Sequence, residues 1–214
     1  MEKNMERTIA VTAEKNQPVV KNRTKKLVLT AMLGALATVL MLLEFPMPFA
    51  PSFVRMDFSE LPVMIGGLLM GPGYGAAIAL LKVMINFLLN GTTTMGVGEL
   101  VNLIGSLSYV LPASLFYFAG KTKKRGRSAL VIGTLCVSVI LTLANAFIVF
   151  PLYVRLFGMT TEQLIQMGTV VNPFVTDLVT MMLFSILPFN LFKYGVTSVI
   201  TWFTYKRVSR TVKG

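Results

Sequence analysis

Basic residues gather at three places in this chain, and long apolar stretches separate those places. Of the 20 Lys and Arg residues, 16 lie in residues 3–26, in the segment 121–127 or in the tail 206–213. The cytoplasmic flanks of membrane helices collect Lys and Arg. Each apolar stretch between two clusters must then cross the membrane an even number of times. The pattern therefore predicts that both termini and the 121–127 loop are cytoplasmic.

The composition is that of a membrane protein rather than of a water-soluble domain. Hydrophobic residues make up 54% of the chain and charged residues only 14%, whereas soluble domains carry about 25% charged residues. The net charge of +11 lies beside apolar stretches. We therefore expect it to face the anionic lipid headgroups of the cell membrane bilayer, and we expect no nucleic acid as a partner.

Motifs of the common enzyme classes are missing from the sequence. There is no histidine, the most frequent general base and metal ligand, and the single cysteine, Cys136, lies inside an apolar stretch. No phosphate-binding loop of the G-x-x-x-x-G-K-[ST] type occurs. We therefore expect a binding subunit that depends on partners for energy, with no catalytic activity, metal or cofactor of its own.

Six apolar segments are interpreted as membrane crossings, since a helix needs about 20 residues to cross the hydrocarbon core. They cover residues 27–43, 58–70, 74–89, 97–118, 129–150 and 188–205. The predicted fold class is an all-α integral membrane protein with six transmembrane helices. The predicted organisation is a polar, basic cytoplasmic segment (1–24), a membrane domain (25–208) and a cytoplasmic basic tail (209–214).

The start of the sixth crossing depends on one proline. Proline has no N–H and is favoured in the first turn of a helix, and Pro188 lies about one bilayer thickness before the basic tail. This places residues 152–187 outside the membrane, partly helical, as a cover over the outer mouth. A longer, kinked helix that begins near Pro173 is the alternative.

Three polar side chains are expected to meet near the outer ends of the last two crossings. Asn190 and Lys193 share one helix face because they are three residues apart, and Asn145 lies about one turn from the outer end of the fifth crossing. An amide offers a donor and an acceptor, and an ammonium offers donors. This set suits a planar ligand edge on which carbonyls and N–H groups alternate, although hydrogen bonds between neighbouring helices are an alternative.

Other polar residues in the crossings allow two interpretations each. Asn102 either contacts the ligand or bonds to a neighbouring helix. Asp57 either contacts the ligand or caps the second helix, with Glu60 three residues later. Lys82 is expected to pair with Glu60 or Glu99, because a buried charge needs a partner of opposite sign.

The order and spacing of several short motifs resemble the riboflavin-specific S components of energy-coupling factor (ECF) vitamin transporters. The resemblance covers about residues 26–208. Its motifs are Asp57-Phe58-Ser59-Glu60-Leu61-Pro62, Gly71-Pro72, Leu81-Lys82 with Asn86, Asn102, Asn145 with Pro151-Leu152-Tyr153, and Pro188-Phe189-Asn190 with Lys193-Tyr194-Gly195. The loop between the last two crossings looks longer than is usual in that family, and residues 1–24 have no counterpart.

The resemblance implies a six-helix subunit that binds riboflavin near the outer side, with Asn145, Asn190 and Lys193 on the flavin ring. It also implies a transmembrane T component and two ATPase subunits as partners. Ala31 and Ala35 match an alanine pair that faces the T component in that family. Three other functions stay open on the residues alone. They are an S component for another vitamin such as thiamin, a self-sufficient secondary transporter with Glu60, Glu99 and Lys82 as a proton relay, and a structural membrane protein without a ligand.

Overall fold

The computed structural model describes residues 22–48, 50–51 and 54–213. Of the predicted N-terminal segment, residues 1–21 therefore lie outside the described residues. The described elements are α2 (Arg23–Leu42), β1 (Phe45–Pro46), β2 (Arg55–Met56), α3 (Glu60–Met70), α4 (Pro72–Asn90), α5 (Val97–Phe118), α6 (Lys123–Ala144), η1 (Asn145–Val149), α7 (Phe150–Phe157), α8 (Thr161–Thr169), α9 (Leu178–Met181), η2 (Met182–Ile186) and α10 (Leu187–Lys213).

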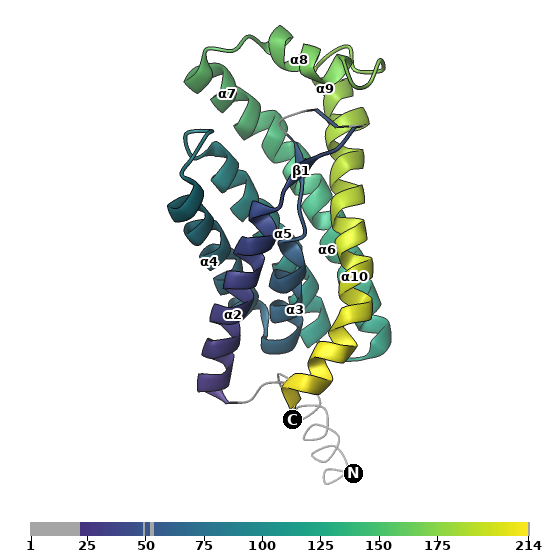
Figure 1. Ribbon diagram of the computed structural model, residues 1–214. Helices are drawn as coiled ribbons and strands as arrows, with labels where there is room; N and C mark the ends of the chain where they lie inside the picture. Colours follow the sequence, from purple (N-terminus) through teal and green to yellow (C-terminus); the bar gives the residue numbers. More distant parts are fainter. Residues whose placement is uncertain (1–21, 49, 52–53, 214) are drawn as a thin grey trace.

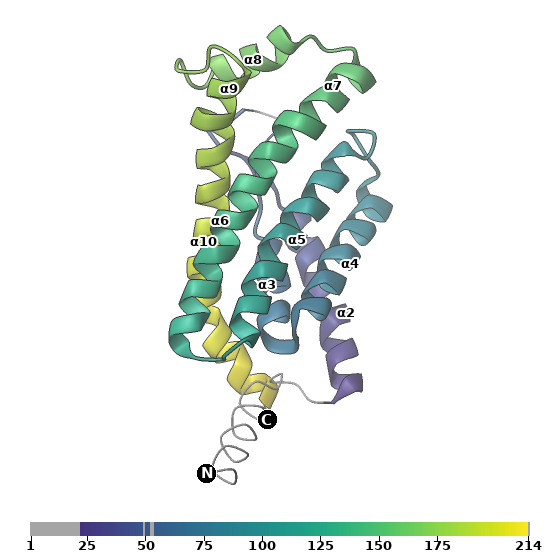
Figure 2. The same cartoon turned by 180° about the vertical axis from the view of Figure 1, so that it is seen from behind.

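These helices form an elongated bundle with the short helix α3 at its centre (Figures 1 and 2). α5 packs against α4 and α6, α2 packs against α4, and α10 packs against α6 and α3. The predicted all-α architecture is confirmed for these residues, apart from the two-residue strands β1 and β2. These strands pair in antiparallel fashion and bring Phe45 opposite Met56.

Within the part of the chain that the structure describes, five helical segments are long and apolar enough to cross a membrane, instead of the six predicted. The predicted crossing at 58–70 is the helix α3, which has 11 residues. At 1.5 Å per residue it is about 16 Å long, roughly half of the hydrocarbon thickness. Ten of its residues are buried, so α3 is a core element of the bundle. The residues that precede it, 54–59, continue into the bundle as an extended segment.

The predicted start of the last crossing at Pro188 is wrong. A continuous helical segment runs from Leu178 to Arg210 through the π-helical turn η2, which is closer to the alternative of a longer helix. Proline inside a helix leaves the carbonyl four residues earlier without its N–H partner. Here that carbonyl belongs to Phe184, and the Asn172 side-chain amide donates to it at 3.0 Å. The proline is tolerated because a side chain replaces the missing donor.

The fifth crossing is also longer than predicted, since it continues past Pro151 to Phe157. The segment Lys123–Phe157 has 35 residues, about 50 Å of helix, which exceeds the thickness of a bilayer. Its upper part, α7, and the helix α8 lie at the end of the bundle away from the start of α2 (Figure 1). The last residues of 152–187 belong to the final long helix, and the interpretation as an outer cover stays a prediction for residues 152–177.

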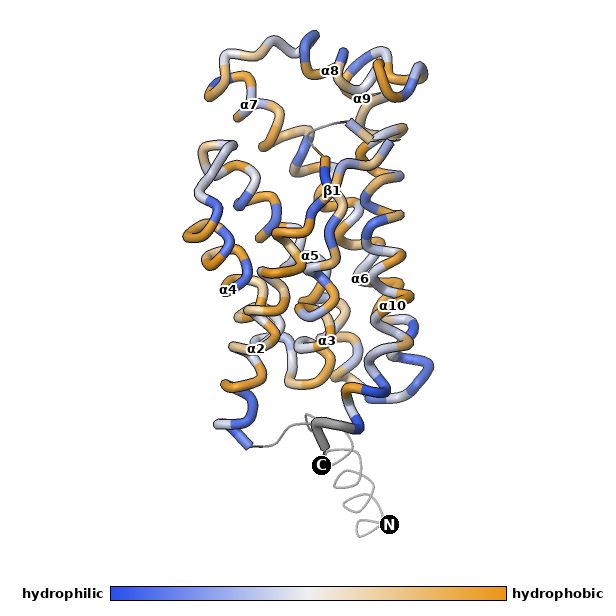
Figure 3. The backbone as a smooth tube through the Cα atoms, in the orientation of Figure 1, coloured by the Kyte–Doolittle hydropathy of each residue, from blue (hydrophilic) through white to orange (hydrophobic). Residues whose placement is uncertain are grey.

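The basic clusters gather at one end of the molecule, as far as they lie within the described residues. Figure 3 shows hydrophilic residues at the start of α2 and in the α5–α6 connection, which lie at the same end of the molecule as the end of α10. The cations of Arg127 and Lys206 lie 4.8 and 5.4 Å from the ring centre of Trp202. Tyr117 and Tyr205 are joined by a 3.0 Å hydrogen bond between their hydroxyls. This end combines basic and aromatic side chains, as membrane interfaces do.

Helices α3 and α4 approach each other closely at a pair of glycines. A Cβ on Gly75 would lie 2.9 Å from the Cα of Gly67 and 2.6 Å from Cγ2 of Val110. We predict that Gly75→Ala lowers the unfolding free energy by about 1–3 kcal/mol, the usual cost of overpacking a core. Thermal unfolding of the purified protein in detergent measures this change. Gly73→Ala is the matched control, because a Cβ there meets nothing within 4 Å. Equal unfolding temperatures for the two variants would contradict the close contact.

Candidate functional site

A cavity of about 480 Å³ lies in the half of the bundle away from the basic end. Its walls come from the end of α2 and Glu44 after it, the segment before α3, the end of α4, the α4–α5 connection, the start of α5, α6, η1, α7, η2 and α10. Ligand cavities in proteins commonly measure about 300–1,000 Å³. All five residues predicted to contact a ligand line this one cavity, namely Asp57, Asn102, Asn145, Asn190 and Lys193. The structure thus brings together residues that are far apart in the sequence.

The side-chain amide of Asn190 is the clearest sign of a binding function. Asn190 is 5% exposed, and its buried Nδ2 atom has no hydrogen-bond partner among the described residues. A buried polar group left without a partner costs about 1–3 kcal/mol. Its position on the cavity wall gives it access to a ligand that can accept this hydrogen bond.

Lys193, one turn further along α10, has a partner that the sequence did not reveal. Its Nζ atom lies 2.6 Å from Oδ2 of Asp57 and 3.3 Å from the backbone oxygen of Arg55. Asp57 belongs to the extended segment before α3, outside the helices. Asp57 is 3% exposed, and the Lys193 ammonium gives its buried carboxylate a partner of opposite sign. The ion pair fixes the ammonium at the cavity wall and ties the extended segment to α10.

The interpretation of Asp57 as the N-cap of the second helix is wrong. The helix begins at Glu60, and its N-cap residue Ser59 makes no side-chain capping bond. The Asp57 carboxylate instead accepts a 2.8 Å hydrogen bond from the Ser59 N–H, just before the helix. Glu60 does not close a capping box either, because its carboxylate is engaged with Lys82.

Asn102 and Asn145 present their amides to the cavity in the same way. The Nδ2 atom of Asn102 donates to the Gly98 oxygen at 3.0 Å, and that of Asn145 donates to the Leu141 oxygen at 2.8 Å. In both, the amide oxygen accepts no hydrogen bond from the described residues and is left as an acceptor for a ligand. Asn145 opens the π-helical turn η1 and lies about three turns before the end of the long helix, not one turn as predicted.

A sealed polar cluster lies in the core near the cavity. The Lys82 ammonium donates to Glu60 Oε1 at 2.7 Å, to Ser59 Oγ at 3.0 Å and to Ser106 Oγ at 2.8 Å. The side chains of Lys82 and Glu60 are 0% and 2% exposed. The predicted pairing of Lys82 with Glu60 is confirmed. Lys82 does not line the cavity, and its three bonds make it a link between α3, α4 and α5.

Several residues of the cavity wall were not predicted from the sequence. Glu44 and Arg55 face each other at 3.2 Å, and Tyr194 also lines the wall. The pairing of Glu44 with Arg55 depends on the strands β1 and β2, which are too short to be recognised in the sequence.

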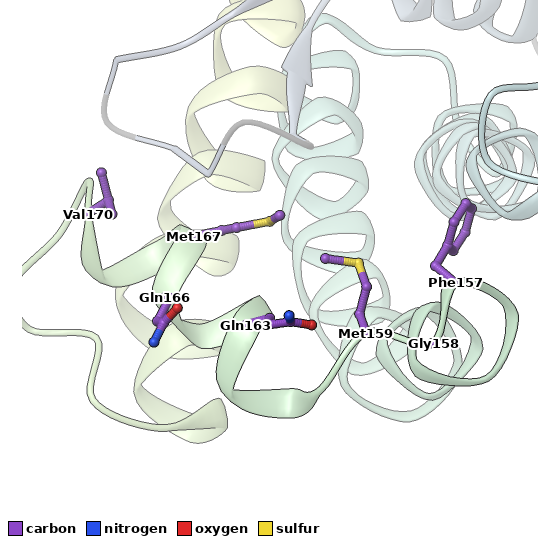
Figure 4. Close-up of a pocket in the computed structure, with 7 residues that line it drawn as sticks. All are labelled: Phe157, Gly158, Met159, Gln163, Gln166, Met167 and Val170. Carbon is purple, nitrogen blue, oxygen red and sulfur yellow. The ribbon is translucent and has the colours of Figure 1, made fainter.

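A second hollow, of about 580 Å³, lies between the end of α7 and α8 (Figure 4). It is lined by Phe157, Gly158, Met159, Gln163, Gln166, Met167 and Val170. None of these side chains carries a charge. None was predicted to bind a ligand. The buried Asn190 amide, which needs a partner, lies instead on the wall of the cavity inside the bundle.

A multi-pass bundle of apolar helices with a polar cavity toward one end defines a membrane protein that binds a small molecule. The chain belongs to the family of ECF transporter substrate-specific components, whose sequence profile matches residues 25–205. This confirms the resemblance noted in the sequence. It also confirms that the chain is a transporter component and not an enzyme, with ATP hydrolysis in partner subunits.

Individual relatives agree with the family assignment. Riboflavin transporter RibU of Staphylococcus aureus (strain TCH60) is 29% identical over 193 residues, 89% of this chain and 94% of that protein. Riboflavin transporter FmnP of Bacillus subtilis (strain 168) is 29% identical over 181 residues, 83% of this chain and 88% of that protein. A solved structure of the S component of a bacterial ECF transporter matches with a TM-score of 0.70 and 27% identity, over 90% of this chain and 100% of that chain.

The sealed cluster gives a prediction about stability. Lys82→Met leaves the buried Glu60 carboxylate without its cation, which typically costs about 3–5 kcal/mol. We expect a large fall in the thermal unfolding temperature in detergent. The double variant Lys82→Met with Glu60→Gln removes both charges and is expected to recover a substantial part of the loss. If the single variant unfolded like the unchanged protein, Lys82 would not form part of a buried ion pair.

Proposed function

We propose that this chain is a riboflavin-specific S component, which captures the vitamin from outside the cell for uptake driven by a partner ATPase module. The observation that carries the proposal is the buried Asn190 amide with no partner among the described residues, on a cavity wall shared with Lys193 and Asn145. The names of the relatives in S. aureus and B. subtilis support riboflavin as the ligand.

The chemistry of the wall suits the two parts of riboflavin. The isoalloxazine ring has one edge on which carbonyl and N–H groups alternate, and the amides of Asn145 and Asn190 offer both donors and acceptors to such an edge. Lys193 adds a charged donor, held by Asp57. The opposite, polar wall includes Asn102 and the α4–α5 connection, and it suits the hydroxyls of the ribityl chain. In this arrangement Asp57 acts on the ligand through Lys193.

The proposed topology has six crossings, with α3 and the extended segment before it forming the second. Both termini and the 121–127 loop are cytoplasmic, because Lys and Arg collect on the cytoplasmic side of membrane proteins. The cavity then opens toward the outer side. The basic segment 1–24 and the tail 209–214 face the cytoplasm.

The proposed partners are a transmembrane T component and two ATPase subunits. The chain has no nucleotide-binding loop, so it depends on these subunits for ATP hydrolysis. Ala31 and Ala35 are exposed, one turn apart on α2, and small residues in this spacing allow a second helix to approach closely. We propose this face of α2 as part of the contact with the T component.

The ligand assignment predicts loss of affinity in two single variants. Asn190→Ala and Lys193→Ala each remove a buried hydrogen bond to the flavin, and we expect riboflavin affinity to fall about ten- to a hundredfold. Quenching of flavin fluorescence on binding to the purified protein measures the affinity, and thiamin serves as a competitor that should not displace the flavin. Thr201→Ala is the matched control, since Thr201 is buried on α10 and does not line the cavity. Unchanged affinity in both variants would rule out the proposed site.

The topology is tested by cysteine labelling in whole cells. In a Cys136→Ser background, we expect a cysteine introduced by Glu162→Cys on α8 to react with a membrane-impermeant maleimide from outside. A cysteine introduced by Lys124→Cys, in the basic loop, should react only after the membrane is opened. Both residues are exposed. The reverse pattern of labelling would place the basic clusters outside and refute the proposed orientation.

A further inference from the structure

Of the carboxylates on the cavity wall, one has no balancing cation in the part of the chain that the structure describes. The charged side chains that line the cavity are Glu44, Arg55, Asp57, Glu99 and Lys193. Glu44 is paired with Arg55, and Asp57 is paired with Lys193. Among the described residues Glu99 forms no salt bridge. Three carboxylates and two cations leave one negative charge on the wall, and that charge belongs to Glu99.

The position of Glu99 is fixed by the loop in front of α5. Its Oε2 atom accepts hydrogen bonds from the hydroxyls of Thr92 at 3.2 Å and Thr94 at 3.5 Å. These hydroxyls themselves accept bonds from the N–H groups of Gly96 and Gly98, at 2.8 and 2.9 Å. The other carboxylate oxygen, Oε1, accepts no hydrogen bond from the described residues. The side chain is therefore held in place with one acceptor atom free for a ligand.

The place of Glu99 in the cavity assigns it to one end of the ligand. A flavin ring held by Asn145, Asn190 and Lys193 lies against η1 and α10. Glu99 comes from the start of α5, next to the end of α4, and α4 and α10 lie on opposite sides of the bundle in both views (Figures 1 and 2). The part of the ligand near Glu99 is then the hydroxyl-bearing chain that extends from the ring. A carboxylate oxygen is a strong acceptor for such hydroxyls.

A helix N-terminus can itself attract a phosphate through its free N–H groups, and α5 begins near Glu99. Two of these groups are already used, however. The Val97 N–H donates to the Thr94 oxygen at 3.0 Å, and the Gly98 N–H donates to the Thr94 hydroxyl. The loop before α5 therefore already uses two of the N–H groups at the start of this helix. The charge of Glu99 makes this part of the cavity negative.

We infer that Glu99 is a specificity-determining residue that favours riboflavin over its phosphate ester, flavin mononucleotide. This inference rests on the proposed riboflavin function. Glu99 accepts hydrogen bonds from the chain hydroxyls of the vitamin, and it repels the phosphate that the ester carries at the end of the same chain. The repulsion acts in a partly enclosed site, where charges interact more strongly than in bulk water.

The test compares the affinities of purified unchanged protein and Glu99→Gln for riboflavin and for flavin mononucleotide. The amide keeps the size of the side chain and an acceptor oxygen but removes the charge. We expect the ratio of the two dissociation constants to shift about tenfold in favour of the phosphate ester. Glu162→Gln is the matched control, because it removes the same charge from α8, outside the cavity.

Salt provides a second measurement that needs no variant. Raising the salt from about 0.05 M to about 0.5 M shortens the range of electrostatic repulsion. In the unchanged protein, we expect the dissociation constants for riboflavin and flavin mononucleotide to become more similar at high salt. In Glu99→Gln, the ratio of the two constants should change less.

Three results would overturn the inference. The first is a ratio of the two dissociation constants in Glu99→Gln that stays within about twofold of the ratio in the unchanged protein. The second is an equal shift in Glu162→Gln. The third is a preference of the unchanged protein that does not respond to salt. In these cases riboflavin still binds and the proposed function stands. If the unchanged protein bound neither flavin, the proposed function itself would fail, and the inference would fail with it.

Discussion

Inside a membrane, a polar group must find its partner within the protein or in a bound ligand, because no water is available to it. Two buried lysines meet this demand in different ways. Lys82 is surrounded by Glu60 and two serine hydroxyls, all within 3.0 Å, and it does not line the cavity. Lys193 has Asp57 as its partner but lies on the wall of the cavity. The first cluster holds helices together, and the second presents a charge where a ligand can bind.

The short helix α3 makes the cavity possible. A helix that crossed the whole bilayer at this position would fill the centre of the bundle along its full length. With 11 residues, α3 fills only the part toward the basic end. The residues before it enter the bundle in an extended form, where Met56 and Asp57 are 2% and 3% exposed. The backbone of this segment supplies the Arg55 oxygen to Lys193. Because α3 is too short to span the membrane, it leaves room for the cavity. The extended segment before α3 forms part of the cavity wall.

The sequence was sufficient to predict the helical class and five residues that line the candidate site. Polar side chains such as Asn190 stand out because their neighbours in the chain are apolar. The partners of these side chains could not be predicted, since Lys193 and Asp57 are 136 residues apart and no local pattern joins them. The course of the last helix through Pro188 was missed for a similar reason. The amide that replaces the missing N–H comes from Asn172, in the loop before the helix.

The two π-helical turns lie at the cavity and not at the basic end. η1 begins with Asn145 and η2 ends with Ile186, and both of these residues line the cavity. Each turn is followed by a proline two residues after it ends, Pro151 and Pro188. A π-helical turn contains one extra residue, shifts the side chains that follow it and often occurs at functional sites. The long helices are therefore irregular at the level where their side chains must face a ligand. Toward the basic end they are regular, and there Trp202 and Tyr205 pack against neighbouring helices. In both helices a π turn and a proline thus occur together at the level of the cavity.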